Sequence, residues 1–104
     1  MRRAAKVDAN QAEVVDALRR VGASVQPLHA VGAGVPDLLV GYRMANYLLE
    51  VKDGNKPPSA RKLTTKQIEW HEAWRGSVLT VTGPEDAIGQ LGISTVGKKE
   101  NPDD

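Results

Sequence analysis

Two short apolar runs, residues 37–42 and 47–52, constrain the fold of this chain more than any other feature. Runs of this length, bounded by polar and turn-forming residues, predict two β-strands, and the four residues between them predict an antiparallel hairpin. With all four residues in the connection, the two tyrosines that border it face each other, and Asp37 lies opposite Lys52. The chain is therefore expected to contain a sheet built around this hairpin.

The two faces of the predicted hairpin differ in chemistry, because successive side chains of a strand point to opposite faces. One face carries only apolar and aromatic side chains: Leu38, Val40, Tyr42, Tyr47, Leu49 and Val51. The other face brings together Asp37, Glu50 and Lys52. A connection one residue longer or shorter would separate these three charges, so the prediction depends on the register.

The rest of the chain predicts helices that flank a mixed sheet. Thr64-x-x-Gln67 matches a capping box, and Pro84 suits the first turn of a helix. The expected elements are a helix at 11–21, a strand at 24–28, a glycine-rich loop at 31–36, the hairpin, a loop at 56–62, a helix from 65 to about 75, a strand at 78–82, a short helix at 84–91 and an edge strand at 93–96. This order, α-β-β-β-α-β plus a short C-terminal helix, predicts the α/β class.

Length and composition limit the alternatives. A chain of 104 residues suits one domain, expected at residues 1–97, with a disordered tail at 98–104. The absence of cysteine excludes disulfides and thiolate zinc sites. No apolar run approaches the roughly 20 residues that cross a bilayer, so no membrane partner is expected. The protein is expected to be cytoplasmic.

Positive charge is concentrated in one segment, although the net charge of the chain is only +1. Residues 51–66 carry five cations against one anion, and residues 1–6 add three cations. Such runs are often ordinary solvated surface. Beside an acidic metal site they would instead contact phosphates, which positions nucleic acid without reading its sequence. The candidate DNA-binding residues are Lys56, Arg61, Lys62 and Lys66, with Arg61 and Lys62 the strongest pair.

The charged face of the hairpin suggests metal-assisted chemistry. Two carboxylates close together repel each other, which favours protonation of one unless a divalent cation lies between them. Magnesium binds one or two carboxylates together with water and phosphate oxygens. Lys52 beside such a cation would help to activate water or stabilise charge on a phosphate, which predicts hydrolysis of a phosphodiester. The alternative is a cross-strand salt bridge of Lys52 with Asp37 or Glu50.

The spacing of these residues resembles a known signature. Val35-Pro36-Asp37, twelve residues and then Glu50-Val51-Lys52 resemble the Asp…Glu-x-Lys motif of the PD-(D/E)XK nuclease superfamily. Together with Glu13 in the first helix and Gln67 in a later one, the pattern resembles the VRR-NUC family, which is common in phages and similar to Holliday junction resolvases. The resemblance covers residues 9–82 and implies a restriction-endonuclease-like mixed β-sheet flanked by helices.

The resemblance also implies residue roles. Asp37 and Glu50 would bind the metal, Lys52 would be the catalytic lysine, and the Val51 carbonyl would be a further ligand. Glu13 would be an outer ligand or would organise water, although an ordinary solvated carboxylate is the alternative.

Three further features allow two interpretations each. Gln67 would support Lys52 or bind phosphate, or would only complete the capping box, and both roles are compatible. His29 would contact DNA or support the site, although a loop histidine more often does neither, and His71 is expected to pack. The glycines of the 31–36 loop would admit a DNA backbone or simply form a tight turn.

These observations predict a magnesium-dependent DNA endonuclease (Mg2+, with Mn2+ as a substitute) and branched or junction DNA as a candidate substrate. A lone domain offers little surface to duplex DNA, and resolvase-like proteins act as dimers, so a homodimer is expected. If a phage encodes the chain, the protein is expected in the cytoplasm of the host. Two alternatives remain: a DNA-binding module of the same fold without catalysis, and a small interaction protein whose charged trio is a salt bridge.

Overall fold

The computed structural model describes residues 9–93, and these contain the helices and strands predicted between residues 11 and 91 in the predicted order, with a 3-10 helix inside the segment predicted as a loop at 56–62. The elements are α1 (Ala9–Arg20), β1 (Ser24–Pro27), β2 (Leu38–Tyr42), β3 (Ala45–Val51), the 3-10 helix η2 (Pro58–Arg61), α2 (Thr65–Ala73), β4 (Val78–Val81) and α3 (Pro84–Gln90). Of the edge strand predicted at 93–96, Ile93 is not in a strand and the other residues lie outside the described part, as does the predicted tail. No helix of the described part is long and apolar enough to span a membrane.

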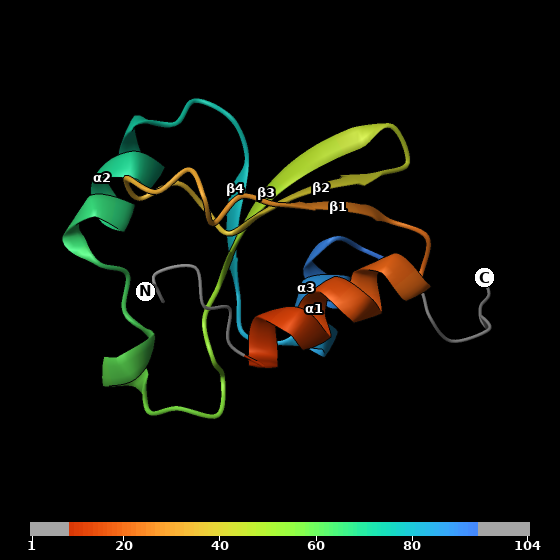
Figure 1. The fold of residues 1–104 in the computed structure, drawn as a ribbon, viewed down its shortest axis with the longest axis horizontal. Helices are drawn as coiled ribbons and strands as arrows, with labels where there is room; N and C mark the ends of the chain where they lie inside the picture. Colours follow the sequence, from red (N-terminus) through yellow and green to blue (C-terminus); the bar gives the residue numbers. More distant parts are fainter. Residues whose placement is uncertain (1–8, 94–104) are drawn as a thin grey trace.

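The four strands form one mixed sheet in the order β1-β2-β3-β4. β1, β2 and β3 are antiparallel neighbours, and β4 pairs with β3 in parallel. A parallel neighbour requires a crossover connection, which here consists of η2 and α2. Figure 1 shows α1 and α3 together on one side of the sheet and α2 apart from them, at the far end of the molecule. The predicted α/β architecture is confirmed.

The core lies between the sheet and the pair α1 and α3. Val14 and Leu18 come from one face of α1, since residues four apart in a helix share a side. The hairpin contributes the alternating apolar residues predicted for its inner face, and Tyr42 and Tyr47 pack partly against them. The fully buried aliphatic side chains are Val14, Leu18, Leu38, Val40, Leu49 and Val81. Burial of each such side chain contributes about 1.5–3 kcal/mol, so this layer fixes the face that the sheet presents outward.

The predicted four-residue hairpin connection is wrong. Tyr42 pairs with Ala45, which leaves only Arg43 and Met44 in the turn. The strands are therefore displaced by two residues from the predicted register. Because side chains alternate with a period of two, this displacement keeps every side chain on its predicted face.

The corrected register changes which charges lie opposite each other. Leu38 pairs with Leu49, so continuation by one residue sets Asp37 opposite Glu50 rather than opposite Lys52. The directly facing pair is thus Asp37 and Glu50, rather than Asp37 and Lys52.

The turn itself explains why its length was hard to predict. Two-residue hairpin turns match the strand twist, but they commonly require a positive φ at both positions and favour Asn-Gly. Here Arg43 (φ 52°) and Met44 (φ 68°) adopt that conformation, although both carry a Cβ. Left-handed backbone costs such residues roughly 1–2 kcal/mol each.

Met44→Gly should therefore stabilise the protein by about 0.5–1 kcal/mol, because the Met44 side chain is fully exposed and no packing is lost. Urea unfolding would measure the change. Met44→Ala is the matched control, since it removes the same side chain but keeps the Cβ. A glycine variant no more stable than the alanine variant would contradict this account of the turn.

Candidate active site

Asp37 lies where the glycine-rich loop enters the sheet. The backbone of Leu28 donates a hydrogen bond to the Asp37 carbonyl (2.7 Å), and the preceding Pro36 is buried, so the loop end is fixed at this point. The Asp37 carboxylate in turn accepts a hydrogen bond from the Val51 amide (Oδ2 to N, 2.7 Å). Since Val51 separates Glu50 from Lys52, this bond holds Asp37 beside both.

Gln67 of α2 completes the cluster. Its Oε1 accepts a hydrogen bond from Lys52 Nζ (2.9 Å), and its Nε2 donates one to Glu50 Oε2 (3.1 Å). Lys52 Nζ also lies 3.6 Å from Glu50 Oε2. The structure therefore brings together four of the predicted residues, Asp37, Glu50, Lys52 and Gln67.

Both interpretations of Gln67 hold at once. Thr64 Oγ1 accepts a hydrogen bond from the backbone N–H of Gln67 (3.2 Å), and Gln67 Oε1 accepts one from the backbone N–H of Thr64 (2.9 Å). These two bonds form the predicted capping box. The same Oε1 accepts from Lys52. The start of α2 and the position of the lysine are consequently fixed by one side chain.

The glycine-rich loop also positions α2. Gly34 has a positive φ (83°), and a Cβ there would overlap the Lys66 carbonyl in the first turn of the helix. Glycine is thus required by close packing within the protein. The close packing of Gly34 against α2 therefore explains why a glycine stands at this position, without any contact with DNA.

Burial makes the carboxylate pair electrostatically unusual. The Glu50 side chain is only 2% exposed and that of Lys52 is 15% exposed. Burial, and then the adjacent Asp37 carboxyl, raise the pKa of Glu50 to about 8, although Lys52 opposes the shift. Glu50 Oε1 is buried and has no hydrogen-bond partner. A buried acceptor without a partner is costly and points to a missing cation or donor.

These donors fit a hard divalent cation. Asp37 and Glu50 provide two facing carboxylates, one with an unpartnered buried oxygen. Among the described residues no third acidic, histidine or cysteine side chain joins them. Two carboxylates, completed by water and phosphate oxygens, are the usual protein contribution to a magnesium site.

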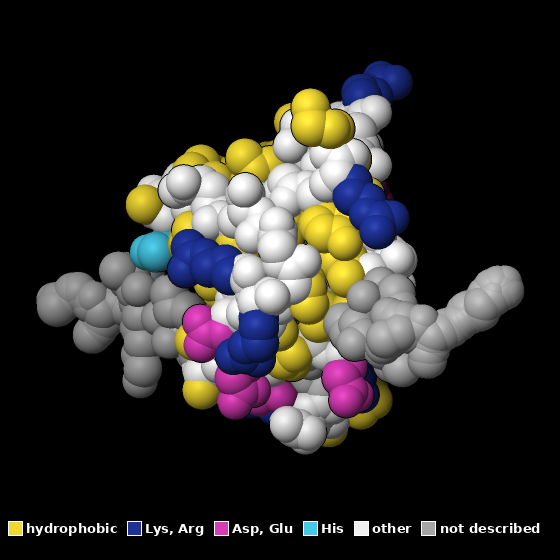
Figure 2. Space-filling view, turned by 90° about the vertical axis from the view of Figure 1, so that its right-hand side faces the viewer, with side chains coloured by type: hydrophobic (Ala, Val, Ile, Leu, Met, Phe, Trp, Pro, Cys, Tyr) yellow, Lys and Arg dark blue, Asp and Glu magenta, His cyan; other side chains and the backbone are white. Residues whose placement is uncertain are grey.

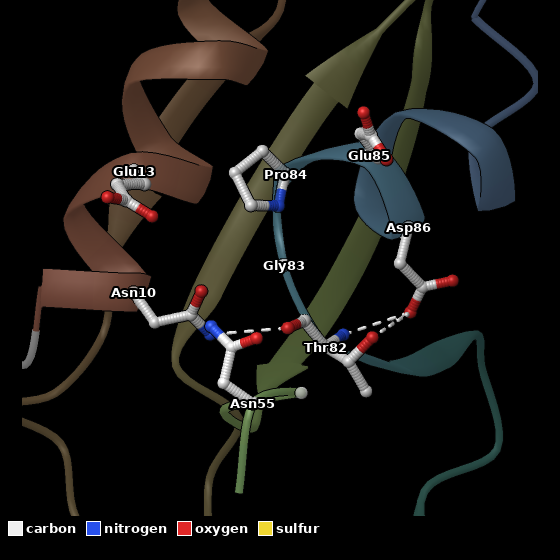
Figure 3. A pocket seen from close by; sticks show the side chains of 9 residues that line it. Asn10, Glu13, Asn55, Thr82, Gly83, Pro84, Glu85 and Asp86 are labelled. Carbon is white, nitrogen blue, oxygen red and sulfur yellow. Dashed lines mark hydrogen bonds between the residues drawn. The ribbon is translucent and has the colours of Figure 1, made fainter.

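Glu13 lies elsewhere. It is exposed on α1 at the edge of a polar hollow of about 540 Å³, together with Asn10, Gly54 and Asp86 (Figure 3). The hollow's polar groups support the fold: Asn10 donates to the carbonyls of Lys52 (3.0 Å) and Thr82 (3.4 Å). Asp86 accepts from the backbone and hydroxyl of Thr82, as the dashed lines in Figure 3 show. Among the described residues Glu13 forms no three-carboxylate cluster with Asp37 and Glu50, although its helix contacts the Lys52 backbone through Asn10.

Three of the predicted DNA-binding cations lie on the segment that connects β3 to α2, and Lys66 lies in the first turn of α2, at the same end of the molecule (Figure 1). Lys56, Lys62 and Lys66 are exposed, whereas Arg61 is half-buried. The opposite end, shown in Figure 2, intersperses lysine and arginine with acidic and apolar side chains. His29 is exposed and directly follows Leu28, the backbone partner of Asp37.

His71 packs as expected, with its ring edge-on to that of Trp70 (centroids 6.3 Å apart). It lies one helical turn after Gln67, its Nε2 is buried without a hydrogen-bond partner, and burial and then the charge of Lys52 lower its pKa. The spacing of four residues from Gln67 was the available signal.

The pKa of Glu50 predicts how stability depends on pH in the metal-free protein. Between pH 4.5 and about 8 the folded protein keeps the Glu50 proton while the unfolded chain releases it. The free energy of unfolding should therefore fall as pH rises through this window, by at most about 1.4 kcal/mol per pH unit from this group. Thermal or urea unfolding in chelator would measure it.

Glu50→Gln should remove this contribution, because the amide does not titrate. The exposed Glu72 of α2 offers a control, since Glu72→Gln should retain the full dependence. Equal pH slopes for the Glu50 variant and the unchanged protein would contradict the assignment.

Comparison with known proteins identifies the fold. No protein-family model matches the chain, and no curated protein matches it. A solved structure described as a "VRR_NUC domain" is similar, with a TM-score of 0.59 and 26% sequence identity, and the match covers 79% of this chain and 89% of that one. The resemblance to the VRR-NUC family and the predicted fold class are thereby confirmed.

Proposed function

We propose that this VRR-NUC-type domain is a metal-dependent DNA endonuclease that hydrolyses phosphodiester bonds. The observation that carries the proposal is the pair of the half-buried Asp37 and the buried Glu50, with an unpartnered Glu50 oxygen, held against Lys52. The similarity to a structure named as a VRR_NUC domain supports a nuclease in particular.

Asp37 and Glu50 are the proposed magnesium ligands, with the Val51 carbonyl as a further one and Mn2+ as a substitute. When bound there, such a cation would orient the phosphate and promote ionisation of the attacking water. The raised pKa of Glu50 means that metal binding and proton release are coupled, so affinity for the metal should increase with pH.

Lys52 is the proposed catalytic lysine. Its ammonium is largely buried and is held by Gln67 and Glu50, so it has a fixed position beside the carboxylates. A fixed positive charge there would stabilise the negative charge that develops on the phosphate, at no cost of reorganisation. Gln67 acts as a positioning residue, since it restrains both Lys52 and Glu50.

Substitution of Glu50 tests the proposal directly. Glu50→Gln and Lys52→Ala should each lower magnesium-dependent cleavage of plasmid or oligonucleotide DNA by about a hundredfold or more, because a metal ligand or a transition-state charge is lost. Glu72→Gln is the matched control, and a loss of cleavage in Glu13→Gln would support the implied role for Glu13. Undiminished cleavage by the first two variants would contradict the proposal.

A binding measurement separates this function from its alternative, a catalytically inactive DNA-binding module. Magnesium should raise the melting temperature of the unchanged protein at pH 8 but not that of Glu50→Gln, because only a cation bound to the folded state stabilises it. DNA binding without any effect of magnesium or manganese would favour the inactive module.

The cations between β3 and α2 are the proposed phosphate ligands, with His29 as a nearby candidate. Combined Arg61→Ala and Lys62→Ala should reduce the salt dependence of duplex binding, by about 0.9 in the logarithmic slope for each phosphate that is no longer neutralised. The same pair of changes at Arg19 and Arg20 of α1 is the control. An unchanged slope in the first variant would exclude these two residues as phosphate ligands.

Branched or junction DNA and a homodimer remain proposals. A single domain of this size presents little surface to duplex DNA, and cleavage of two paired strands is simplest for a dimer. Light scattering coupled to size exclusion, with and without four-way, forked, flapped and linear DNA, tests both.

A further inference from the structure

Trp70 lies on α2 and Trp74 is its C-cap, about one and two turns after Gln67 of the carboxylate cluster. Trp70 and Trp74 of the α2 region stack with ring centroids 4.6 Å apart and planes inclined by 18°. Although it is stacked, Trp74 remains 45% exposed. Gln67 and Trp74 are seven residues apart, close to two helical turns, so they lie on the same side of α2.

A largely apolar hollow of about 420 Å³ separates Trp74 from the sheet. Leu39 and Leu48 form its floor, and Leu39 is 38% exposed. Asn46 and Ser77 add hydrogen-bonding side chains to its lining. The hollow thus combines an aromatic wall, an aliphatic floor and polar groups, at a size that suits one small organic ring system.

The hollow continues the face of the sheet that carries the carboxylates. Leu48 precedes Glu50 by two residues on β3, and Leu39 follows Asp37 by two residues. Two residues along a strand span about 6.6 Å and return to the same face. A nucleotide whose phosphate lies at the carboxylates would therefore bring the adjoining base within reach of Trp74.

Charge supports the same occupant. The exposed cations Lys62 and Lys66 lie on the segment that leads into α2 and begins it. Lysines at one end of α2 and an exposed indole at the other would combine phosphate contacts with base stacking, the two features by which proteins hold single strands. A base within a duplex is stacked on both sides and is not free to enter such a hollow.

Building on the proposed nuclease function, we propose that the hollow beside Trp74 binds an unpaired base next to the scissile phosphate. The preferred substrates are then DNAs that have unpaired nucleotides at the point of cleavage, such as flaps, forks and single strands.

Intrinsic fluorescence tests the proposal without catalysis, because all tryptophan emission of this chain comes from the Trp70 and Trp74 pair. The protein in chelator would be titrated with a thymidine oligonucleotide, a flapped duplex and a blunt duplex of two complementary strands. The oligonucleotide and the flap should quench the emission, since a stacked base contacts the indole, and the blunt duplex should not. Equal quenching by all three DNAs, or none, would overturn the proposal.

Substitution of Trp74 gives a second readout. Trp74→Ala should lower affinity for the thymidine oligonucleotide about tenfold, with little effect on blunt duplex, whereas Trp74→Phe should retain most of the affinity. Ile68→Ala is the control, since Ile68 is a similarly exposed apolar residue (43%) of α2 that does not line the hollow. Circular dichroism would verify the fold of each variant.

The outcomes distinguish this proposal from the nuclease proposal. Magnesium-dependent cleavage with no tryptophan quenching would reject the base site and leave the nuclease. Quenching by single strands without cleavage under any metal would support the base site and reject the nuclease. If Trp74→Ala changed only the oligomeric state and left DNA affinity intact, the hollow would be an interface between copies and the base site would be rejected.

Discussion

The burial of the Glu50 carboxyl next to the carboxyl of Asp37 is the constraint on which this structure depends. Two facing carboxylates in an environment that excludes water are unfavourable when both are charged, which is why the pKa of Glu50 rises to about 8. Lys52 and Gln67 offset part of this cost by direct contacts with Glu50, but they leave one Glu50 oxygen without a partner. A divalent cation would relieve the remaining repulsion between the carboxylates and bind the unpartnered oxygen. The burial that destabilises the metal-free protein is therefore also what favours the proposed metal chemistry.

The hydrogen bonds of Gln67 connect this local problem to the fold. Lys52 continues β3, and α2 begins thirteen residues later, after the η2 segment. Through one amide, the helix start, the lysine and the glutamate are held together. Gly34 adds a backbone contact between the loop before Asp37 and the same helical turn. Each group of the cluster is therefore positioned by an element distant in sequence, which is how a small domain with little core can hold a site rigidly.

The sequence predicted the elements and the facing of the charges because both follow from local periodicity. It failed at the hairpin length, since Arg43 and Met44 adopt a conformation that their side chains disfavour. The error did not disturb the site, because a displacement by two residues preserves the faces and only exchanges partners. Glu13 was harder to place, since the packing of a helix against a sheet is a tertiary property. The capping box correctly located Gln67, but only the structure shows that the same oxygen reaches Lys52.

The position of α2 explains how the outer face of the sheet can carry charged residues at one end and an apolar hollow at the other. At the N-terminal end of α2 Gln67 contacts Glu50 and Lys52, and just past the other end Trp74 lines the hollow with the exposed Leu39 and the half-buried Leu48. An apolar surface left partly open costs solvation energy, and a fold that needed α2 only to support the lysine would gain by closing it. That the helix instead ends at the exposed Trp74, stacked on the half-buried Trp70, argues that this end of the sheet is shaped for a ligand with a flat apolar face, adjoining the charged group that the carboxylates and Lys52 would process.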